Sequence, residues 1–364
     1  MCLNNQQGNT TMLMKKLTAS ALIFSALFWS AGAHAQTVGP SGEAATPSAT
    51  ITLSDADLAA LKGKNYKAAL LWHTSSDFTN AVSAGAKDEF AKAGIQIVVQ
   101  TDAGFDAAKQ RSDIETALAA KPNVILALPL DPTTSAEAFR QAVTDGSKLV
   151  FLSNLPTGYK QGTDYAAIVT DDLFQMGKQA ADALAKAIGG KGKVGYIFHD
   201  ASYYVTNQRD RAFKTTIEKD YPNIKIVAEQ GISDPARAEE LANAMLLKNP
   251  DLDGIYVTWA EPADGVLAAL RAAGNKTTKV VTLDLAEPVA LDMVKGGNVT
   301  ALVADKAYEL GRAMAAAGMK SLLGEKIAPF VVAPALTVTK ANVSQGWKDS
   351  LNRDAPQSVL DAAK

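Results

Sequence analysis

The sequence predicts an α/β protein built from two doubly wound parallel-sheet lobes. From Tyr66 onward, short apolar runs alternate with longer amphipathic stretches. Near-continuous apolar runs separated by helices are typical of parallel strands that are covered on both faces. About ten such runs are too many for one doubly wound domain, and the roughly 330 residues after the N-terminal apolar segment exceed one typical domain. Two lobes are therefore expected.

The predicted strands follow one another at regular intervals. They are 67–72, 95–100, 123–128, 148–153, 166–170, 193–198, 224–229, 254–258, 279–283 and 299–304. Residues 79–94 and 173–190 have the pattern of amphipathic helices. A short helix over 53–63 can be capped by the Ser54 hydroxyl. The closing segment 329–340 lacks a helical period and is expected to be extended.

Residues 1–35 have the organisation of a secretory signal peptide. Lys15 and Lys16 precede an apolar run over 17–31. Ala33 and Ala35 then provide the small residues of a cleavage site between Ala35 and Gln36. A membrane anchor is the alternative, but a bilayer-spanning helix needs about 20 apolar residues. Residues 1–13 precede the charged segment. The translation start is therefore expected to have been assigned too far upstream.

The segment that follows the signal is small and polar. Residues 36–63 are expected to form a flexible leader that ends in the short helix. Removing residues 1–35 takes two of the 36 basic residues and none of the 38 acidic ones, which leaves a formal charge of −4. This slight acidity argues against a nucleic-acid partner. The same removal takes the only Cys, so the mature chain has no disulfide.

Polar and aromatic side chains gather directly after the apolar runs. Ligands of open parallel sheets bind beyond the carboxyl ends of the strands, so these residues are candidates. They include His73, Asp77, Phe78, Ser153, Asn154, His199, Trp259, Asp284 and Asp305. Taken singly, Asp305 fits a helix cap and Trp259 fits a core ring. Together, rings that cover C–H faces and polar groups that bind hydroxyls suit a neutral polyhydroxy ligand.

Two further motifs are interpreted as structural. The G-x-G-x-x-G match over 190–195 precedes a predicted strand instead of following one, so it indicates a helix end and a turn. His73 and His199 lack a third ligand at a recognisable spacing, and no metal is expected. No cofactor is expected either, since no Walker motif is present, and the lack of G-x-S-x-G argues against an α/β-hydrolase.

The order of these features resembles the type I periplasmic sugar-binding proteins, the ribose-binding-like substrate receptors of ABC importers. The resemblance covers residues 66 to about 340. Residues 75–94 resemble the first loop and helix of that family, and 113–132 resemble its second strand–helix passage, in which the strand ends in Pro plus a polar residue. TNQRDRAF (206–213) resembles a helix opening in the second lobe, and KVVTLD (279–284) resembles a strand that ends in a ligand-binding Asp.

The resemblance implies roles for individual residues. Phe78 matches a sugar-stacking aromatic, and Asp284 matches the binding Asp. Ser153 and Asn154 stand where ribose receptors have Asp and Arg, so recognition of the ribose kind is not expected. Asn207 matches a sugar-contacting position that is often Arg. With Arg absent at two matched positions, a neutral sugar or polyol is favoured over an acid or a phosphate.

In residues 203–213, which follow the strand 193–198, we expect different roles for neighbouring side chains. Thr206 caps the helix, Asn207 reaches into the cleft, and Arg209 braces the lobe. Tyr204 or its neighbour Tyr203 forms a wall. The full set of expected ligand-binding residues is His73, Asp77, Phe78, Ser153, Asn154, His199, Tyr204, Asn207, Arg209, Trp259, Asp284 and Asp305.

The resemblance also implies an architecture and a mechanism. Three chain crossings form the hinge, near 169–172, 304–306 and 330–332. Lobe one then comprises 64–170 with 305–331, and lobe two comprises 171–304 with 332–364. The lobes close around the ligand, and an ABC permease in the inner membrane receives the closed form. A monomer in the periplasm is expected.

Other functions remain open from the residues alone. A transcriptional regulator can use the same two-lobe fold, but a signal peptide and a leader stand where its DNA-binding helices belong. A secreted enzyme is a second alternative, in which His199 with Asp200, or Asp284, does acid–base work. A binding protein for a non-sugar cargo, such as an autoinducer or another small polar metabolite, is the third.

Overall fold

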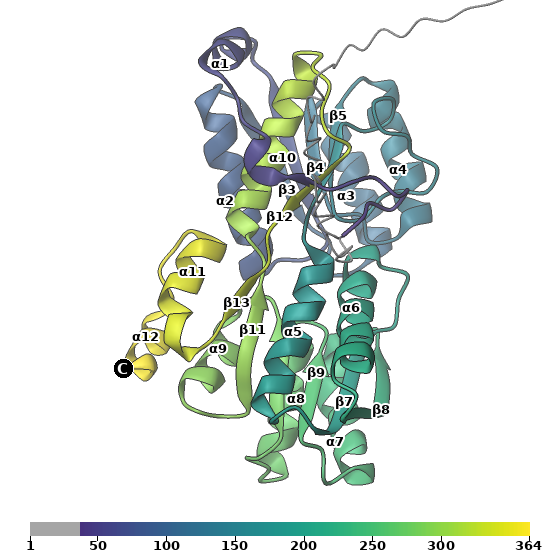
Figure 1. The fold of residues 1–364 in the computed structure, drawn as a ribbon. Coiled ribbons are helices and arrows are strands. Elements are labelled where there is room, and N and C mark those ends of the chain that lie inside the picture. The colour runs from purple at the N-terminus through teal and green to yellow at the C-terminus, as the bar shows by residue number, and fades with distance from the viewer. Residues whose placement is uncertain (1–36) are drawn as a thin grey trace, which may run out of the picture. The chain divides into compact units, whose positions relative to one another are not determined.

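The structure is a computed structural model that describes residues 37–364. The predicted signal peptide over 1–35 and the over-long start over 1–13 lie outside the described residues. Within the described part, two sheets flanked by helices confirm the predicted fold class (Figure 1). None of the helices in residues 37–364 has the length and apolar character needed to cross a membrane.

The first sheet has seven strands, and every neighbouring pair is parallel. In spatial order they are β1 (Thr46–Pro47), β12 (Phe330–Ala333), β6 (Ala167–Asp171), β5 (Lys148–Leu152), β4 (Val124–Ala127), β2 (Lys67–Trp72) and β3 (Gln96–Asp102). Its helices are α1 (Asp55–Leu61), α2 (Asp77–Lys92), α3 (Ala107–Ala119), α4 (Pro132–Thr144) and α10 (Ala307–Leu322). We call this part lobe one.

The second sheet has six strands, and only its edge strand β13 is antiparallel to its neighbour. In order they are β13 (Leu336–Val338), β11 (Val299–Ala304), β10 (Lys279–Leu283), β9 (Gly254–Val257), β7 (Gly192–His199) and β8 (Ile224–Ile232). Its helices are α5 (Leu173–Ala187), α6 (Tyr204–Asp220), α7 (Ala238–Lys248), α8 (Ala260–Ala272) and α9 (Glu287–Val294). This part is lobe two, and Figure 1 shows α5 and α6 side by side on it.

The remaining elements are short or terminal. They are the 3-10 turns η1 (Ser48–Thr50), η2 (Pro235–Arg237) and η3 (Lys340–Asn342) and the C-terminal helices α11 (Val343–Leu351) and α12 (Gln357–Ala363). Helix α11 packs against both α10 and β13, and α12 packs against α9. The C-terminal segment therefore contacts elements of both lobes.

Burial of both sheet faces explains why the strands read as continuous apolar runs. On β2, Ala68, Leu70 and Trp72 pack into one core cluster, whereas Ala69 and Leu71 pack into another. Successive strand residues point to opposite faces, so a sheet with helices on both sides needs apolar residues at every position. Fully burying a Leu of this kind contributes about 1.5–3 kcal/mol.

The chain crosses between the two sheets at 171–173, 304–307 and 333–336. The first two crossings lie within two residues of the expected positions. The third falls later than 330–332, because β12 remains paired with β6 in the first sheet up to Ala333, which stands beside Asp171. Strand β13 then joins the second sheet, where Thr337 pairs with Val303.

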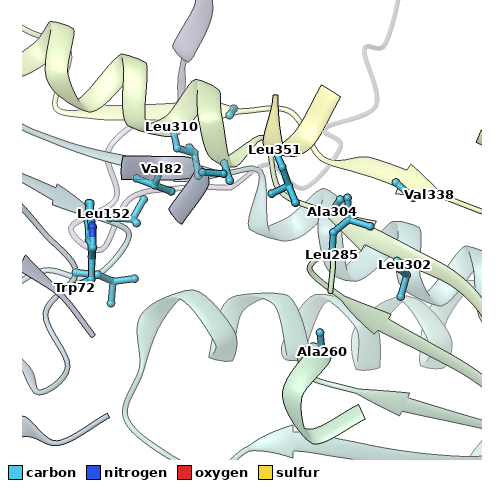
Figure 2. Packing of buried hydrophobic residues seen from close by; sticks show 14 of the residues in the cluster. Trp72, Val82, Leu152, Ala260, Leu285, Leu302, Ala304, Leu310, Val338 and Leu351 are labelled. Atoms are coloured by element: carbon cyan, nitrogen blue, oxygen red, sulfur yellow. The ribbon is translucent and has the colours of Figure 1, made fainter. Parts of the chain in front are cut away.

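One apolar core continues past these crossings. Figure 2 shows Leu310 of α10 near Val82 of α2, and Ala304 at the end of β11 farther along the same cluster. Helices α2 and α10 approach closely at Gly85 and Gly311. A Cβ on Gly85 would clash with the backbone of α10, and one on Gly311 would clash with that of α2, so side chains larger than hydrogen are excluded there.

The leader differs from the expectation of a flexible segment. Strand β1 pairs with β12, and Ser48 donates a hydrogen bond to Glu309 of α10. At the other end, the Thr37 hydroxyl donates to Asp172 over 2.7 Å, and Tyr204 donates to the Val38 carbonyl. The described leader is therefore held against both lobes. The short helix does begin after Ser54, and its capping box confirms that cap.

Candidate functional site

The candidate site is a pocket between the carboxyl ends of the two sheets. It encloses about 760 Å³ when the space open to solvent is included. Nine of the twelve residues expected from the sequence line it: His73, Asp77, Phe78, Ser153, His199, Arg209, Trp259, Asp284 and Asp305. Residues from both lobes line the same space. This agrees with the rule that ligands of open parallel sheets bind beyond the carboxyl ends of the strands, which we call the strand-end rule.

Asn154, Tyr204 and Asn207 do not line this pocket. Asn154 is buried and bonds the Pro129 carbonyl and the Val205 backbone N–H, so it connects the lobes beside the pocket. Tyr204 turns toward the leader and bonds the Val38 carbonyl. The wall expected from one of the two tyrosines is provided by Tyr203 instead.

Asn207 and Thr206 exchange the roles expected for them. Helix α6 begins at Tyr204, and its N-cap residue is Tyr203. The Asn207 side chain accepts from the Tyr203 backbone N–H at 3.0 Å and donates to the His199 carbonyl at 3.2 Å, so it ties the helix start to the preceding loop. Thr206 does not cap the helix. It lines the pocket, and its hydroxyl lies 2.8 Å from His199 Nδ1.

Arg209 lies at the centre of the charged part of the pocket. Its Nη1 is 2.8 Å from Asp284 Oδ1 and 4.0 Å from Asp305 Oδ1, while Nη2 donates to the Thr258 carbonyl at 3.2 Å. The Arg209 side chain is only 5% exposed and that of Asp284 is 21% exposed, so bulk water weakens this ion pair less than it would a surface pair. Arg209 therefore braces lobe two, as expected, and also faces the pocket.

Close helix packing sets the position of Arg209. Helix α5 meets α6 at Gly177, where a Cβ would clash with the backbone oxygen of Arg209. Because Gly177 has no side chain, α6 lies against α5 and its guanidinium side chain can reach the strand ends of β9 and β10. The sequence shows this glycine only as one of many.

Three pocket residues have strained backbone conformations. Phe105, Ser153 and Asp284 have φ values of 62°, 58° and 67°, in the left-handed region that side chains other than Gly seldom adopt. Each follows the end of a strand, namely β3, β5 or β10. Strain of this kind costs about 1–3 kcal/mol per residue and clusters at ligand sites, where it sets the direction of a side chain.

An array of rings crosses the pocket from lobe one to lobe two. His73 packs edge-on against Phe105 at 5.2 Å, and Phe105 stacks on Trp259 at 6.4 Å. Trp259 contacts His199 at 5.0 Å, and His199 contacts Tyr203 at 5.4 Å. The contact between Phe105 and Trp259 joins the two lobes. Ring faces of this kind can cover the C–H surface of a ligand.

Four buried polar atoms of the pocket have no hydrogen-bond partner. They are His73 Nδ1, Tyr203 Oη, Arg209 Nε and Trp259 Nε1. Each of these residues is at most 8% exposed. An unpaired buried donor or acceptor costs about 1–3 kcal/mol, so a ligand that pairs with them gains that free energy. Three of these atoms, on Tyr203, Arg209 and Trp259, are N–H or O–H donors, which suit the hydroxyl oxygens of a polyol.

Burial shifts the pKa values of several pocket groups. It lowers the pKa of His73 and of His199 to about 4 each, so both imidazoles are neutral at pH 7. Burial also raises the pKa of Asp171 to about 6 and moves the pKa of Asp305 well above its usual value. The Asp284 carboxylate contributes to the second shift by repulsion.

The residues expected from the sequence do not include several others that line the pocket, among them Asp171, Phe105 and Glu261. Asp171 and Phe105 were within reach of the strand-end rule, because both follow an apolar run that was predicted as a strand. Within residues 37–364, no group of three or more His, Cys, Asp or Glu side chains is arranged to hold a metal ion.

Two lobes with a shared pocket at their strand ends define a two-lobe solute-binding protein. The model of the periplasmic binding protein domain matches residues 68–326, and the chain belongs to that family. The family consists of receptors, so the protein is a binding protein and not an enzyme.

Individual relatives and structures agree with this assignment. A Rhizobium meliloti protein that carries the name of a rhizopine-binding protein is 26% identical over 263 residues, which cover 71% of this chain and 85% of that protein. The ribose import binding protein of Bacillus subtilis is 24% identical over 71% of this chain and 82% of its own length. A solute-binding protein from Agrobacterium vitis bound to alpha-D-tagatopyranose has a TM-score of 0.70 and 26% identity, covering 77% of this chain and 96% of that one.

Proposed function

We propose that this protein is a periplasmic receptor that binds a small sugar or polyol between its two lobes and delivers it to the permease of an ABC transporter. The unpaired polar atoms of His73, Tyr203, Arg209 and Trp259 carry the proposal, since these four residues, from both lobes, line one pocket. A polyol carries several hydroxyls that suit such groups, and the ring array can cover its C–H faces.

Hinge closure supplies the mechanism. Phe105 and Trp259 come from different lobes, and so do Asp171 and Asp284, so a ligand that touches both sets gains affinity only when the lobes are closed. The ligand therefore stabilises the closed form by the contacts that it makes there and not in the open form. The names of relatives that bind ribose, and a neighbour that holds tagatose, support a monosaccharide-sized cargo.

Export and the partner complete the proposal. The N-terminal segment directs the chain to the periplasm and is cleaved between Ala35 and Gln36, and the monomeric closed form is the species that the permease accepts. Identification of Gln36 as the N-terminal residue of the protein recovered from the periplasm would support this step. A mature protein that begins elsewhere in the folded part, or that stays in the cytoplasm, would contradict it.

A ligand screen tests the binding function. The chain from residue 36 onward is unfolded in urea, refolded to remove any bound solute, and heated with single sugars and polyols. A ligand present at about 100 times its Kd stabilises the protein by about 2.7 kcal/mol, which raises the melting temperature measurably. The proposal fails if the solute that is released from the protein purified without unfolding is neither a sugar nor a polyol.

A further inference from the structure

Residues 37–51, which we call the strap, connect the two lobes in addition to the three chain crossings. The C-terminal end of the strap is fixed to lobe one, and its N-terminal end is fixed to lobe two. The strap precedes the first helix of lobe one, so neither sheet needs it to connect two of its own strands. Its contacts with both lobes therefore call for an explanation of their own.

The end of the strap on lobe one is held by strand pairing, hydrogen bonds and burial. Strand β1 lies parallel to β12 at the edge of the first sheet. Ser48 is 1% exposed and donates a hydrogen bond from its hydroxyl to Glu309 of α10. Arg312, one turn further along α10, donates to the Ile51 carbonyl at 3.1 Å, and Ile51 belongs to the main apolar core cluster. This end is part of lobe one.

The end of the strap on lobe two is held at the starts of two helices. The Thr37 hydroxyl donates to Asp172 Oδ1 at 2.7 Å and accepts from the Phe174 backbone N–H at 2.8 Å. Asp172 is the N-cap of α5, and Phe174 is in the first turn, where backbone N–H groups lack partners within the helix. Tyr204, the first residue of α6, donates to the Val38 carbonyl. Thr37 is 5% exposed, so its two bonds are shielded from water.

A turn shortens the strap between these two ends. The Gly39 backbone N–H donates to the Glu43 carbonyl at 2.9 Å, and the Ser41 N–H donates to the Glu43 carboxylate at 2.8 Å. A Cβ on Gly39 would clash with that carboxylate, and Gly42 has a φ of 87°, so glycine suits both positions. Moving the ends of the strap apart must therefore open this turn or detach one end.

The lobes are in contact across the pocket while both ends of the strap are attached. Phe105 of lobe one stacks on Trp259 of lobe two at 6.4 Å, and Asn154 of lobe one accepts from the Val205 backbone N–H of lobe two at 3.2 Å. None of the strap residues, all of which the structure describes, lines the pocket, and Tyr204 does not line it either. The strap can therefore act on the arrangement of the lobes without touching a ligand.

We propose that the strap stabilises the closed arrangement of the two lobes and thereby raises the affinity for the ligand. A change to another arrangement has to break the turn or the bonds made by Thr37 and Tyr204. The apparent Kd of a ligand that binds only the closed form is inversely proportional to the fraction of closed protein. This effect on affinity rests on the proposed function, whereas the effect on the lobes needs no ligand.

The distance between spin labels on the two lobes tests the proposal. The labels are attached to Ser112→Cys on α3 and Asn243→Cys on α7, both of which are exposed positions. The only Cys of the sequence is Cys2, so the chain from residue 36 onward has no other labelling site. After unfolding and refolding to remove any bound solute, double electron–electron resonance gives the populations of the closed and the more open arrangements.

A double variant detaches the strap from lobe two. Thr37→Val with Tyr204→Phe removes three hydrogen bonds and keeps the size of both side chains. We expect the ratio of open to closed protein to rise by about tenfold or more. The matched control is Thr144→Val with Tyr308→Phe, because these two hydroxyls bond only within lobe one, to the Arg140 carbonyl and to Asp88. The control is expected to leave the distances unchanged.

A longer strap separates a connection between the lobes from a local effect on α5 and α6. Insertion of Gly-Ser-Gly-Ser after Gly42 keeps both ends attached and relaxes the segment between them, so we expect the open population to rise here too. No rise with the insertion means that the Thr37 and Tyr204 hydroxyls act within lobe two, which overturns the proposal.

Equal distance distributions for the double variant and the unaltered protein also overturn it, whichever arrangement they show. Urea unfolding checks that each variant is folded, and the insertion decides alone if the double variant is not. Since no ligand is used, failure of the proposal leaves the proposed function intact, and the ligand screen tests that function separately.

Discussion

The side-chain oxygen of Asn154 accepts a hydrogen bond from the Val205 backbone N–H, 3.2 Å away on the opposite lobe. Asn154 follows β5 of lobe one, and its amide nitrogen is held by the Pro129 carbonyl at 2.9 Å. Val205 belongs to the first turn of α6, whose N–H groups have no partners within the helix. The bond therefore fastens the N-terminus of α6 to lobe one beside the pocket, which Val205 lines.

Asn154→Ala is expected to weaken ligand binding by about fivefold, since one hydrogen bond of this kind contributes about 1 kcal/mol to the closed form. The loss arises because the closed form becomes less stable relative to the open one, and not because a ligand contact is lost. Calorimetry with the solute found in the thermal screen measures it, and X-ray scattering reports the closure. Asn249→Ala serves as the control, because Asn249 bonds only within lobe two, to the Met245 carbonyl. Equal affinities for the Asn154 variant and the unaltered protein would contradict this role.

Asp284→Ala is expected to abolish binding and also to lower the stability of the protein. From sequence alone, the expectation is lost binding with an intact fold. The structure adds that Arg209 would stay buried without its close partner. Removing one member of a buried pair costs up to about 3–5 kcal/mol, and less here because the Asp284 side chain is 21% exposed. Urea unfolding measures the loss of stability, and unchanged unfolding together with lost binding would assign Asp284 to the ligand alone.

Gly177→Ala tests the packing that positions Arg209. The added Cβ would meet the Arg209 backbone oxygen, so α5 and α6 must separate. Overpacking of this kind costs about 1–3 kcal/mol, and the shift of Arg209 should weaken binding as well. The matched control is Gly94→Ala, at a site in lobe one where nothing lies within 4 Å of the new Cβ but φ is 72°. That control is expected to lower stability without lowering affinity, whereas a Gly177 variant with unaltered affinity would exclude the positioning role.

The strand-end rule accounts for most of the site that the sequence could predict. Asp284, Asp305 and Trp259 follow apolar runs that are strands in the structure, and all three line the pocket. Asp171 obeys the same rule, since it follows the predicted strand 166–170, but it was considered only as part of the hinge crossing at 169–172. The fold class was predictable for a related reason, since burial of both sheet faces leaves a clear apolar pattern.

Side-chain directions at the start of α6 could not be predicted. Successive helix residues differ by about 100° in direction, so an error of two or three residues in the N-cap changes which of them face the cleft. With the cap at Tyr203 instead of Thr206, Arg209 faces the pocket and Asn207 bonds its own helix start.

The order of the N-terminal leader could not be predicted for another reason. Its polar composition is typical of a linker, but its backbone is ordered by pairing with β12, a strand almost three hundred residues later.

His73 is expected to make the fold sensitive to acid. Burial lowers its pKa from 6.5 to about 4, so the unfolded chain binds a proton that the folded chain excludes. Its contribution to stability is present above pH 6.5 and is lost as the pH falls toward 4. In His73→Gln, the difference in the free energy of unfolding between pH 7 and pH 5 should shrink by about 1–2 kcal/mol. Urea titrations at both pH values measure it, and an unchanged difference would mean that His73 is protonated in the folded state.

Trp259 distinguishes the ring contribution from the N–H contribution to binding. Trp259→Phe keeps a ring beside Phe105 and His199 but removes the unpaired Nε1 donor, so the affinity for a polyol should fall by about fivefold, the equivalent of one hydrogen bond. Trp259→Ala removes the ring as well and should cost clearly more. Intrinsic fluorescence gives a second readout, because Trp72 and Trp347 are enclosed in the core at no more than 2% exposure and should not respond to ligand. The ligand-induced change in emission should therefore vanish in both variants. Persistence of that change in Trp259→Phe would place the ligand away from this ring.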